Sequence, residues 1–356
     1  MTQRFSAFIL LLALAIAAPR AGLGQGRPSF PTRLETYMTS TAKLTAVERQ
    51  RLFRGEPVTR LLDADESKEV AILGAVWIDA PMRRYIAAVK DIESFERGGG
   101  FKVTRRISSP PRLDDFRELR IPDEDLQDLR RCKVGNCEVK VAASALNRFH
   151  SEINWNAPNA QASAMAWLQR LAHEYAASYL KGGDAELAVY RDGARPTFVA
   201  QEFREMTGAM PELTTHMPNL RRYLLGFPAV SMPEVSSFLY WQETEFGLKP
   251  VIRLNHLAIR ETAEDAVVIN KMLYASHYFW TGIEIRALVP DPARGSGFWF
   301  VTVNRSRSDG LSGFTGRLIR GRVRGEVDKG ILTALQLTKQ LLERVRDEFT
   351  RARVVV

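Results

Sequence analysis

Two histidines on apolar strand faces are the first candidates for binding chemistry. Side chains alternate along a strand, so His256 shares its face with Leu254. In a strand predicted over 273–288, His277 shares its face with Phe279. A polar group on such a face needs a hydrogen-bond partner or a ligand. If the strands are neighbours, both imidazoles face one cavity; the alternative, which we favour, is two hydrogen-bonded core histidines.

Aromatic residues are concentrated in the same part of the chain, between 238 and 300. Ordinary sheet packing explains most of them. About half would line a single face of the sheet, which favours an apolar pocket. The aromatic residues that we take as candidate ligand contacts, beside the two histidines, are Tyr240, Tyr278, Trp280 and Trp299.

Catalytic patterns are incomplete in this sequence. His173-Glu174 begins a zinc-protease pattern, but Ala177 stands where the second histidine belongs. Ser312 lacks the glycine two places later that a nucleophile elbow requires. We therefore assign no catalytic residue, metal ligand or cofactor, and we favour a protein that is not an enzyme.

The two cysteines, Cys132 and Cys137, flank a Gly135-Asn136 turn. A metal site needs two further ligands, and a redox pair usually has two intervening residues rather than four. In an oxidising compartment this spacing favours a small structural disulfide. Free thiols and a functional pair are the alternatives.

The N-terminus is typical of a secretory signal peptide over residues 1–24. Arg4 precedes an apolar run over 5–18, and small residues follow it. A membrane span needs about 20 apolar residues, so this run is short for one. An uncleaved anchor is the alternative. We expect an exported protein, periplasmic or secreted.

Charge is concentrated towards the C-terminus. Lys and Arg total 50 against 41 Asp and Glu, and from Phe300 onwards there are 12 against 6. Arg317, Arg320 and Arg324 fall on one helical face, which predicts weak contact with an anionic membrane. A solvated outer face is the alternative that we favour. An exported chain without a binding motif is a poor partner for nucleic acid.

The elements that must position these residues are those of an α+β chain. With 45% hydrophobic and 26% charged residues, the composition excludes collagen-like and disordered classes. After a leader with a short helix over 25–65, a buried strand begins at Glu69 and a helix follows Pro81. Helical patterns dominate 122–230, most clearly from Gln161 to Leu180. The later strands are predicted over 238–243, 251–259, 273–288 and 298–304.

One long amphipathic helix ends the chain, with an apolar stripe from Val327 to Phe349 that Leu341 widens. Such a stripe must be buried, and the preceding strands are the apolar surface of matching length. We therefore expect a cavity between these strands and the helix, containing His256 or His277.

Two stretches carry a family resemblance. Val76-Trp-Ile-Asp-Ala-Pro81, with a helix through Asp91-Ile92, resembles the first strand and helix of START-like (helix-grip, SRPBCC) domains. Asn304 through Glu343 is similar to the last strand and lid helix of that superfamily. Short segments such as Tyr274-Ala-Ser-His277-Tyr-Phe and Phe238-Leu-Tyr-Trp241 also resemble segments of exported bacterial proteins with no assigned activity.

The resemblance covers 66–110 and 236–350. It implies a START-like domain over 66–350, in which a curved antiparallel sheet grips the long C-terminal helix. The segment at about 122–230 is then a mainly helical insertion. Domains of this kind usually hold an apolar ligand between sheet and helix.

The expected function is that of an exported, non-enzymatic binding protein. It would hold a hydrophobic small molecule or lipid between the sheet and the C-terminal helix. An envelope interaction or scaffold protein that uses the helical segment is the alternative. An unrecognised hydrolase is the third reading, because His256 and His277 are otherwise unexplained.

Overall fold

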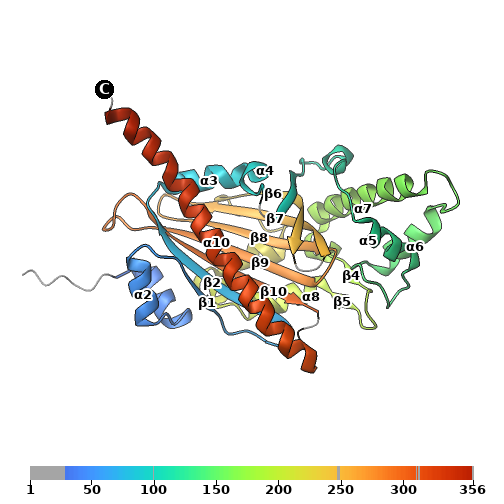
Figure 1. The fold of residues 1–356 in the computed structure, drawn as a ribbon, viewed down its shortest axis with the longest axis horizontal. Helices are drawn as coiled ribbons and strands as arrows, with labels where there is room; N and C mark the ends of the chain where they lie inside the picture. Colours follow the sequence, from blue (N-terminus) through green and yellow to red (C-terminus); the bar gives the residue numbers. More distant parts are fainter. Residues whose placement is uncertain (1–28, 99, 247–248, 310, 312, 355–356) are drawn as a thin grey trace, which may run out of the picture.

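The structure is a computed structural model that describes residues 29–98, 100–246, 249–309, 311 and 313–354. For residue 246 and for 313–320, 322–323 and 345–354, only the backbone is described. The expected signal peptide over 1–24 lies outside these residues. The chain is α+β, with a large antiparallel sheet and a long C-terminal helix, as the sequence predicts (Figure 1).

The N-terminal part forms short helices ahead of the sheet. They are α1 (Thr32–Thr36), a π-helical turn η1 (Tyr37–Thr41) and α2 (Ala46–Phe53). Thr45 and Glu48 form a capping box at the start of α2, since the Thr45 side chain accepts from the Glu48 amide and the Glu48 carboxylate accepts from the Thr45 amide.

Eight strands form the main sheet, in the order β1-β2-β10-β9-β8-β7-β6-β3. All neighbouring pairs are antiparallel. The strands are β1 (Val58–Leu61), β2 (Glu69–Ile78), β3 (Phe101–Arg106), β6 (Val235–Phe246), β7 (Lys249–Glu261), β8 (Ala266–Ala275), β9 (Phe279–Pro290) and β10 (Phe298–Ser308).

The two faces of this sheet are covered by different parts of the chain. On one face, here called the α10 face, Val76 and Ile78 pack with α3 (Met82–Lys90), α4 (Ile92–Phe95) and α10 (Gly313–Val354). The neighbouring residues of β2, Ala75 and Trp77 among them, point to the opposite face. Figure 1 shows α10 crossing the sheet on the side where α3 and α4 lie.

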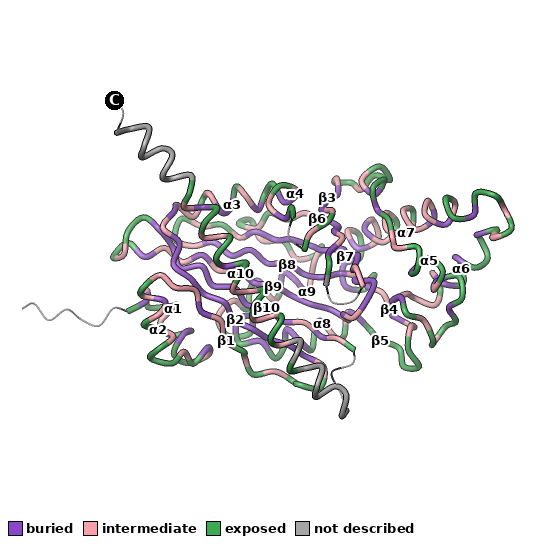
Figure 2. The backbone as a smooth tube through the Cα atoms, in the orientation of Figure 1, coloured by how far each residue is buried: buried purple, intermediate pink, exposed green. Residues whose placement is uncertain are grey.

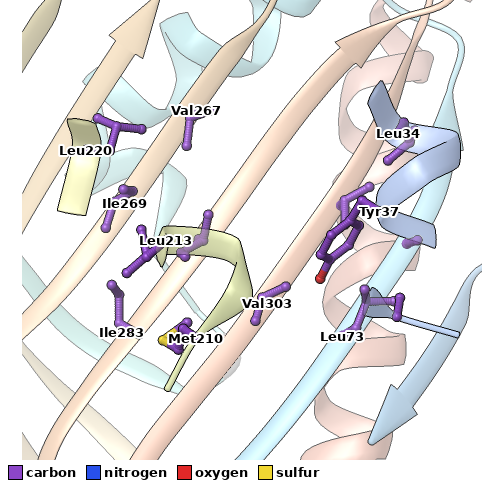
Figure 3. Close-up of a cluster of buried hydrophobic side chains, with 14 of the residues drawn as sticks. Leu34, Tyr37, Leu73, Met210, Leu213, Leu220, Val267, Ile269, Ile283 and Val303 are labelled. Carbon is purple, nitrogen blue, oxygen red and sulfur yellow. The ribbon is translucent and has the colours of Figure 1, made fainter. Parts of the chain in front are cut away.

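The opposite face is covered by the N-terminal helices and by the segment between β3 and β6. In one core cluster Tyr37 and Leu34 pack beside strand residues such as Leu73, and Leu213 packs there from the segment (Figure 3). That segment contains η2 (Leu113–Phe116), α5 (Asp123–Arg131), α6 (Ala143–Glu152), α7 (Ala160–Gly182), η3 (Gly183–Glu186), β4 (Val189–Tyr190), β5 (Thr197–Phe198), α8 (Val199–Gly208), η4 (Glu212–His216) and α9 (Pro218–Gly226).

The helix α7 matches the helix predicted over 161–180. Its far end turns sharply at Gly183, where φ is +60°. A Cβ on this residue would lie 1.8 Å from the Phe227 carbonyl oxygen, so only glycine fits. The turn brings the following residue, Asp184, against the sheet.

The buried stripe of α10 is narrower than predicted. Leu335 and Leu342 are buried against the sheet, whereas Leu341 is 52% exposed and Leu337 59% exposed. The helix lies along β2 near the edge of the sheet, so only a narrow side of the helix contacts other elements (Figures 1 and 2). It approaches β2 closely at Gly74, where a Cβ would lie 2.6 Å from Ile331 Cγ2.

The single strand predicted over 273–288 is wrong. This stretch holds the end of β8, a turn at 276–278 and most of β9. The turn lacks glycine and proline, and Tyr278 instead adopts a positive φ of 62°. Without a glycine or proline, the turn Ser276-His277-Tyr278 does not interrupt the β-favouring residues on either side, which hides it in the sequence pattern.

Candidate functional site

An apolar cavity of about 650 Å³ lies between the opposite face of the sheet and the helices α5, α6 and α7. Trp241 of β6 and Leu254 of β7 contribute from the sheet, and Phe116 contributes from η2. The helices and their connections supply further apolar side chains. These include Leu119, Ile121, Leu129, Val139, Leu168, Leu171, Ala172 and Leu187.

Tyrosines in the wall of this apolar cavity are held by the backbone. The Tyr175 hydroxyl donates to the Leu273 carbonyl at 2.9 Å and accepts from the Ala188 amide at 3.1 Å. The Tyr274 hydroxyl donates to the Lys140 carbonyl at 3.0 Å. Burial raises the pKa of both hydroxyls above the usual value. Both groups therefore stay neutral and fix the walls of the cavity.

His277 lies in the β8–β9 turn and joins the sheet to α5. Its Nε2 is 2.8 Å from Asp125 Oδ2, and its Nδ1 is 3.1 Å from the Glu138 carbonyl oxygen. Asp125 and His277 are 1% and 3% exposed. Asp125 also lines the apolar cavity, and its Oδ1 lies 3.6 Å from Lys249 Nζ. His277 thus has the partners of a core histidine.

His256 lies on the opposite face of the sheet, under the end of α7. Its Nδ1 is 2.9 Å from the Tyr179 hydroxyl, and the Phe227 ring lies 4.4 Å away, centroid to centroid. Burial, together with the charge of Lys271, lowers the pKa of His256 to about 3. The imidazole is therefore neutral at neutral pH.

Lys271 is fully buried beside His256. Its Nζ donates to Asp184 Oδ1 and, at 3.1 Å, to the Leu224 carbonyl. The same nitrogen lies 4.2 Å from the centre of the Phe203 ring. Burial lowers the pKa of Lys271. The sequence reasoning missed this ion pair, because Asp184 reaches Lys271 only through the turn at Gly183.

The two histidines do not share a cavity. His256 packs against α7, whereas His277 contacts α5 and the Glu138 carbonyl. Neither histidine lies between the sheet and α10. This corrects the prediction of a cavity in that position with His256 or His277 in its wall. The physical reason is the register: His256 pairs with Lys271, whose row of side chains points away from α10.

The four aromatic candidates are distributed over the fold, and none of them lines the apolar cavity. Tyr240 lies on the α10 face, and Trp299 packs on the opposite face against Phe30. The Tyr278 hydroxyl accepts from the Lys249 amide at 2.8 Å. Trp280 is half-buried and donates to an Asp309 carboxylate oxygen.

The α10 face carries a polar cluster over β6 to β9. Gln242 and Asn255 are fully buried, and Arg286 is 9% exposed. Arg286 Nη2 lies 2.5 Å from Glu284 Oε2 and 3.5 Å from Glu96 Oε1. These charges make this part of the α10 face unsuitable for an apolar ligand.

The cysteines are bonded to each other, as predicted, with a Cα–Cα distance of 4.8 Å. Of the three candidate arginines for an anionic surface, Arg324 has its Nη2 2.8 Å from Glu66 Oε1. The side chains of Arg317 and Arg320 lie outside the described residues.

Within the described part of the chain, no helix combines the length and apolar character needed to cross a membrane. The same residues contain no group of His, Cys, Asp and Glu side chains arranged to hold a metal ion. Comparisons with protein-family models, with curated proteins and with solved structures found no match.

Proposed function

We propose that this chain is a binding protein for a hydrophobic small molecule or lipid, held in the apolar cavity between the sheet and α5–α7. The observation that carries the proposal is the cavity itself. Its volume of about 650 Å³ falls within the usual range of ligand pockets, roughly 300–1,000 Å³. Its lining is mainly apolar, with fixed tyrosine hydroxyl groups and a few charged residues such as Asp125 and Lys140, which matches an apolar ligand that carries a polar group.

A non-enzymatic role is supported by the surroundings of the two histidines. Hydrolysis by a serine or cysteine requires that nucleophile within hydrogen-bond reach of its base. Among the contacts of the described residues, His256 bonds to Tyr179, and His277 bonds to Asp125 and Glu138. Both cysteines are in the disulfide.

A START-like architecture is part of this proposal, and the topology supports it. The first long strand, β2, lies next to the last strand, β10, and α3 and α4 follow β2 directly. The long helix α10 follows β10 and packs on the sheet. The helical segment between β3 and β6 is then the insertion, and it would supply the ligand cavity in place of α10.

Export is the remaining part of the proposal. It is supported by the disulfide, which is typical of oxidising compartments, and by the signal-peptide pattern of the sequence. An exported protein with an apolar cavity would carry a poorly soluble molecule through an aqueous space.

Native mass spectrometry of the protein purified from its exporting host tests the function. A bound apolar molecule, released on collisional activation, is the expected result. Protein that is ligand-free by this measurement, and that fails to take up a fluorescent fatty acid, would contradict the proposal.

A matched pair of variants on α7 locates the site. Ala172 lines the cavity, so Ala172→Phe should fill part of it and weaken fatty-acid uptake at least tenfold. Ala162 is exposed on the same helix, and Ala162→Phe should leave uptake unchanged. Equal uptake by both variants would place the ligand elsewhere.

A role as an interaction protein of the cell envelope is favoured by one observation. Val189 and Phe198 are cross-strand neighbours on the β4–β5 pair and are 36% and 49% exposed. Exposed apolar pairs of this kind are found at protein contacts. Crosslinking from a photoreactive residue at position 198 in the native host would identify such a partner.

A further inference from the structure

One edge of the main sheet, where β3 lies beside β6, is only partly covered (Figure 2). β3 ends at Arg106, and the last bond along its line runs from the Ile107 amide to the Leu239 carbonyl at 2.9 Å. β6 continues past this point, because the strand begins at Val235. We call residues 235–239 of this strand the β6 edge.

The β6 edge presents backbone groups without partners. Alternate residues of an antiparallel strand direct their N–H and C=O groups to the same neighbour. Since the Leu239 carbonyl accepts from Ile107, both Leu239 and Ser237 direct these groups away from β7. Within the described residues, the Leu239 amide and both backbone groups of Ser237 form no hydrogen bond. Such groups can pair with a second polypeptide in extended conformation.

The chain that follows β3 is held away from the β6 edge. The amide and the hydroxyl of Ser108 both donate to the Asp115 carboxylate, at 3.0 and 2.6 Å. Ser108 therefore does not continue the pairing that Ile107 ends. A cavity of about 350 Å³ remains between this part of the chain and the β6 edge. We call it the edge cavity.

The β6 edge lacks the features that usually protect an edge strand from pairing. Its sequence, Val-Ser-Ser-Phe-Leu, contains no charge and no proline, and Ser236 and Ser237 are exposed. The strand at the other end of the sheet differs. β1 has four residues, one of them Arg60, and its Thr59 donates to Asp328 of α10. The β6 edge is therefore the one that is available to a partner.

We propose that the β6 edge binds an extended segment of another protein by strand addition. The segment lies in line with β3, and its residue opposite Ser237 exchanges two backbone hydrogen bonds with that serine. Cross-strand neighbours point to the same face, so the side chain of this residue enters the edge cavity. Ile107, Leu180 and Leu239 supply apolar side chains there, and an apolar side chain suits the position.

The next side chain of the segment points to the α10 face, beside Arg106. The Arg106 guanidinium stacks on Phe238, 4.1 Å from the centre of the ring. Its neighbour Arg105 pairs with Glu93 and Glu118. Arg106 itself forms no ion pair within the described residues. The segment should therefore alternate, with apolar residues towards the edge cavity and an acidic residue beside Arg106.

Peptide selection on the full mature chain tests this proposal. The probes are random decapeptides displayed on phage, and enriched peptides should carry apolar residues at alternate positions with an acidic residue between them. The tightest peptide is then synthesised with a fluorescent label, and its binding is measured by fluorescence polarisation. Failure to enrich any peptide would overturn the proposal.

Methylation of single peptide nitrogens distinguishes strand addition from other modes of binding. A methyl group on an amide that faces the β6 edge removes a hydrogen bond and should weaken binding by about tenfold or more. Methylation of the amides between them should leave binding nearly unchanged, because they point away from the edge. Equal effects at all positions would contradict strand addition.

Two replacements of Ser237 provide the matched variants. Ser237→Pro removes the amide hydrogen at the β6 edge without removing a bond to β7, and should weaken peptide binding by about tenfold or more. Ser237→Ala keeps this amide and removes only the hydroxyl, which accepts from Tyr223 at 3.1 Å, so binding should be unchanged. Equal binding by the two variants would overturn the assigned site. Thermal denaturation checks that both are folded, and the methylated peptides test the site without any variant.

A second copy of this chain is the competing occupant of the β6 edge. Analytical ultracentrifugation separates the two cases. A dimer that Ser237→Pro dissociates, and that excludes the peptide, would assign the edge to self-association and overturn the proposal. Strand addition does not depend on the proposed apolar ligand, because the edge cavity and the apolar cavity share no lining residue.

Discussion

His256 and Lys271 are cross-strand neighbours of β7 and β8, and both side chains are fully buried on the same face of the sheet. The lysine has a carboxylate partner in Asp184, whereas the imidazole bonds to the neutral Tyr179 hydroxyl. A second positive charge in this position is unfavourable. The pair therefore combines an ion pair with a neutral imidazole, and each half has a measurable consequence.

The neutral imidazole predicts a loss of stability in acid. The pKa of His256 is about 3 when folded and about 6.5 when unfolded, so between these values only the unfolded chain binds the proton. Stability from this group is present above pH 6.5 and decreases as the pH falls towards 3. The expected loss between pH 7 and 4.5 is about 2.5 kcal/mol. Urea denaturation of the native protein and of His256→Gln measures it; parallel pH profiles for the two proteins would contradict the prediction.

The Lys271–Asp184 ion pair predicts an asymmetry between single and double variants. Asp184→Asn leaves the lysine charge buried without its partner, and should cost about 3–5 kcal/mol. Replacing both residues, in Lys271→Met/Asp184→Leu, removes the charge as well and should cost less than the single change. Chemical denaturation of the three proteins provides the test. A double variant that loses as much stability as Asp184→Asn, or more, would contradict the prediction.

The packing of α10 predicts contrasting effects of two leucines two positions apart. Leu335 is 1% exposed against the sheet, so Leu335→Ala should cost about 2–5 kcal/mol. Leu337 is 59% exposed, and Leu337→Ala should change stability by at most about 0.5 kcal/mol. The difference between their thermal midpoints is the measurement. Similar midpoints would mean that α10 does not pack on the sheet in solution.

The disulfide predicts a modest effect on stability. The bond between Cys132 and Cys137 closes a loop with a sequence separation of 5. The chain entropy removed by so short a loop corresponds to about 2 kcal/mol. Cys132→Ser/Cys137→Ser should therefore fold, with its free energy of unfolding lowered by about this amount. Failure of the double variant to fold would show a larger role for the bond.

Local patterns predicted the longer helices and most strands of this fold, whereas α1, η1 and β1 were not predicted. The capping box at Thr45, the helix near 161–180 and the long terminal helix all follow from nearby residues, because capping and amphipathic spacing are local properties. The β8–β9 turn was missed, since Tyr278 occupies a conformation that the sequence pattern assigns to glycine or asparagine. An aromatic residue gives no turn signal.

The candidate site was less predictable, because its parts come from distant segments. The face on which His256 lies follows from alternation, but its partner Tyr179 belongs to a helix 77 positions away. The apolar cavity forms where η2, α5, α6 and α7 meet the sheet. These elements lie far apart in the sequence, so no local pattern predicts that they come together. The apolar periodicity of α7 was the sequence signal available for this cavity. It indicated that one side of the helix is buried, but not which part of the protein covers that side.

The pairing of β2 with β10 has a consequence for how this chain reaches its native state. Trp77 pairs with Trp299, and all ten residues of β2 are buried. Since synthesis proceeds from the N-terminus, one edge of this apolar strand stays open until β10 has been synthesised. Contacts so distant in sequence slow folding, and an open apolar edge invites pairing with other chains. The growing chain should therefore depend on a holding chaperone until β10 arrives.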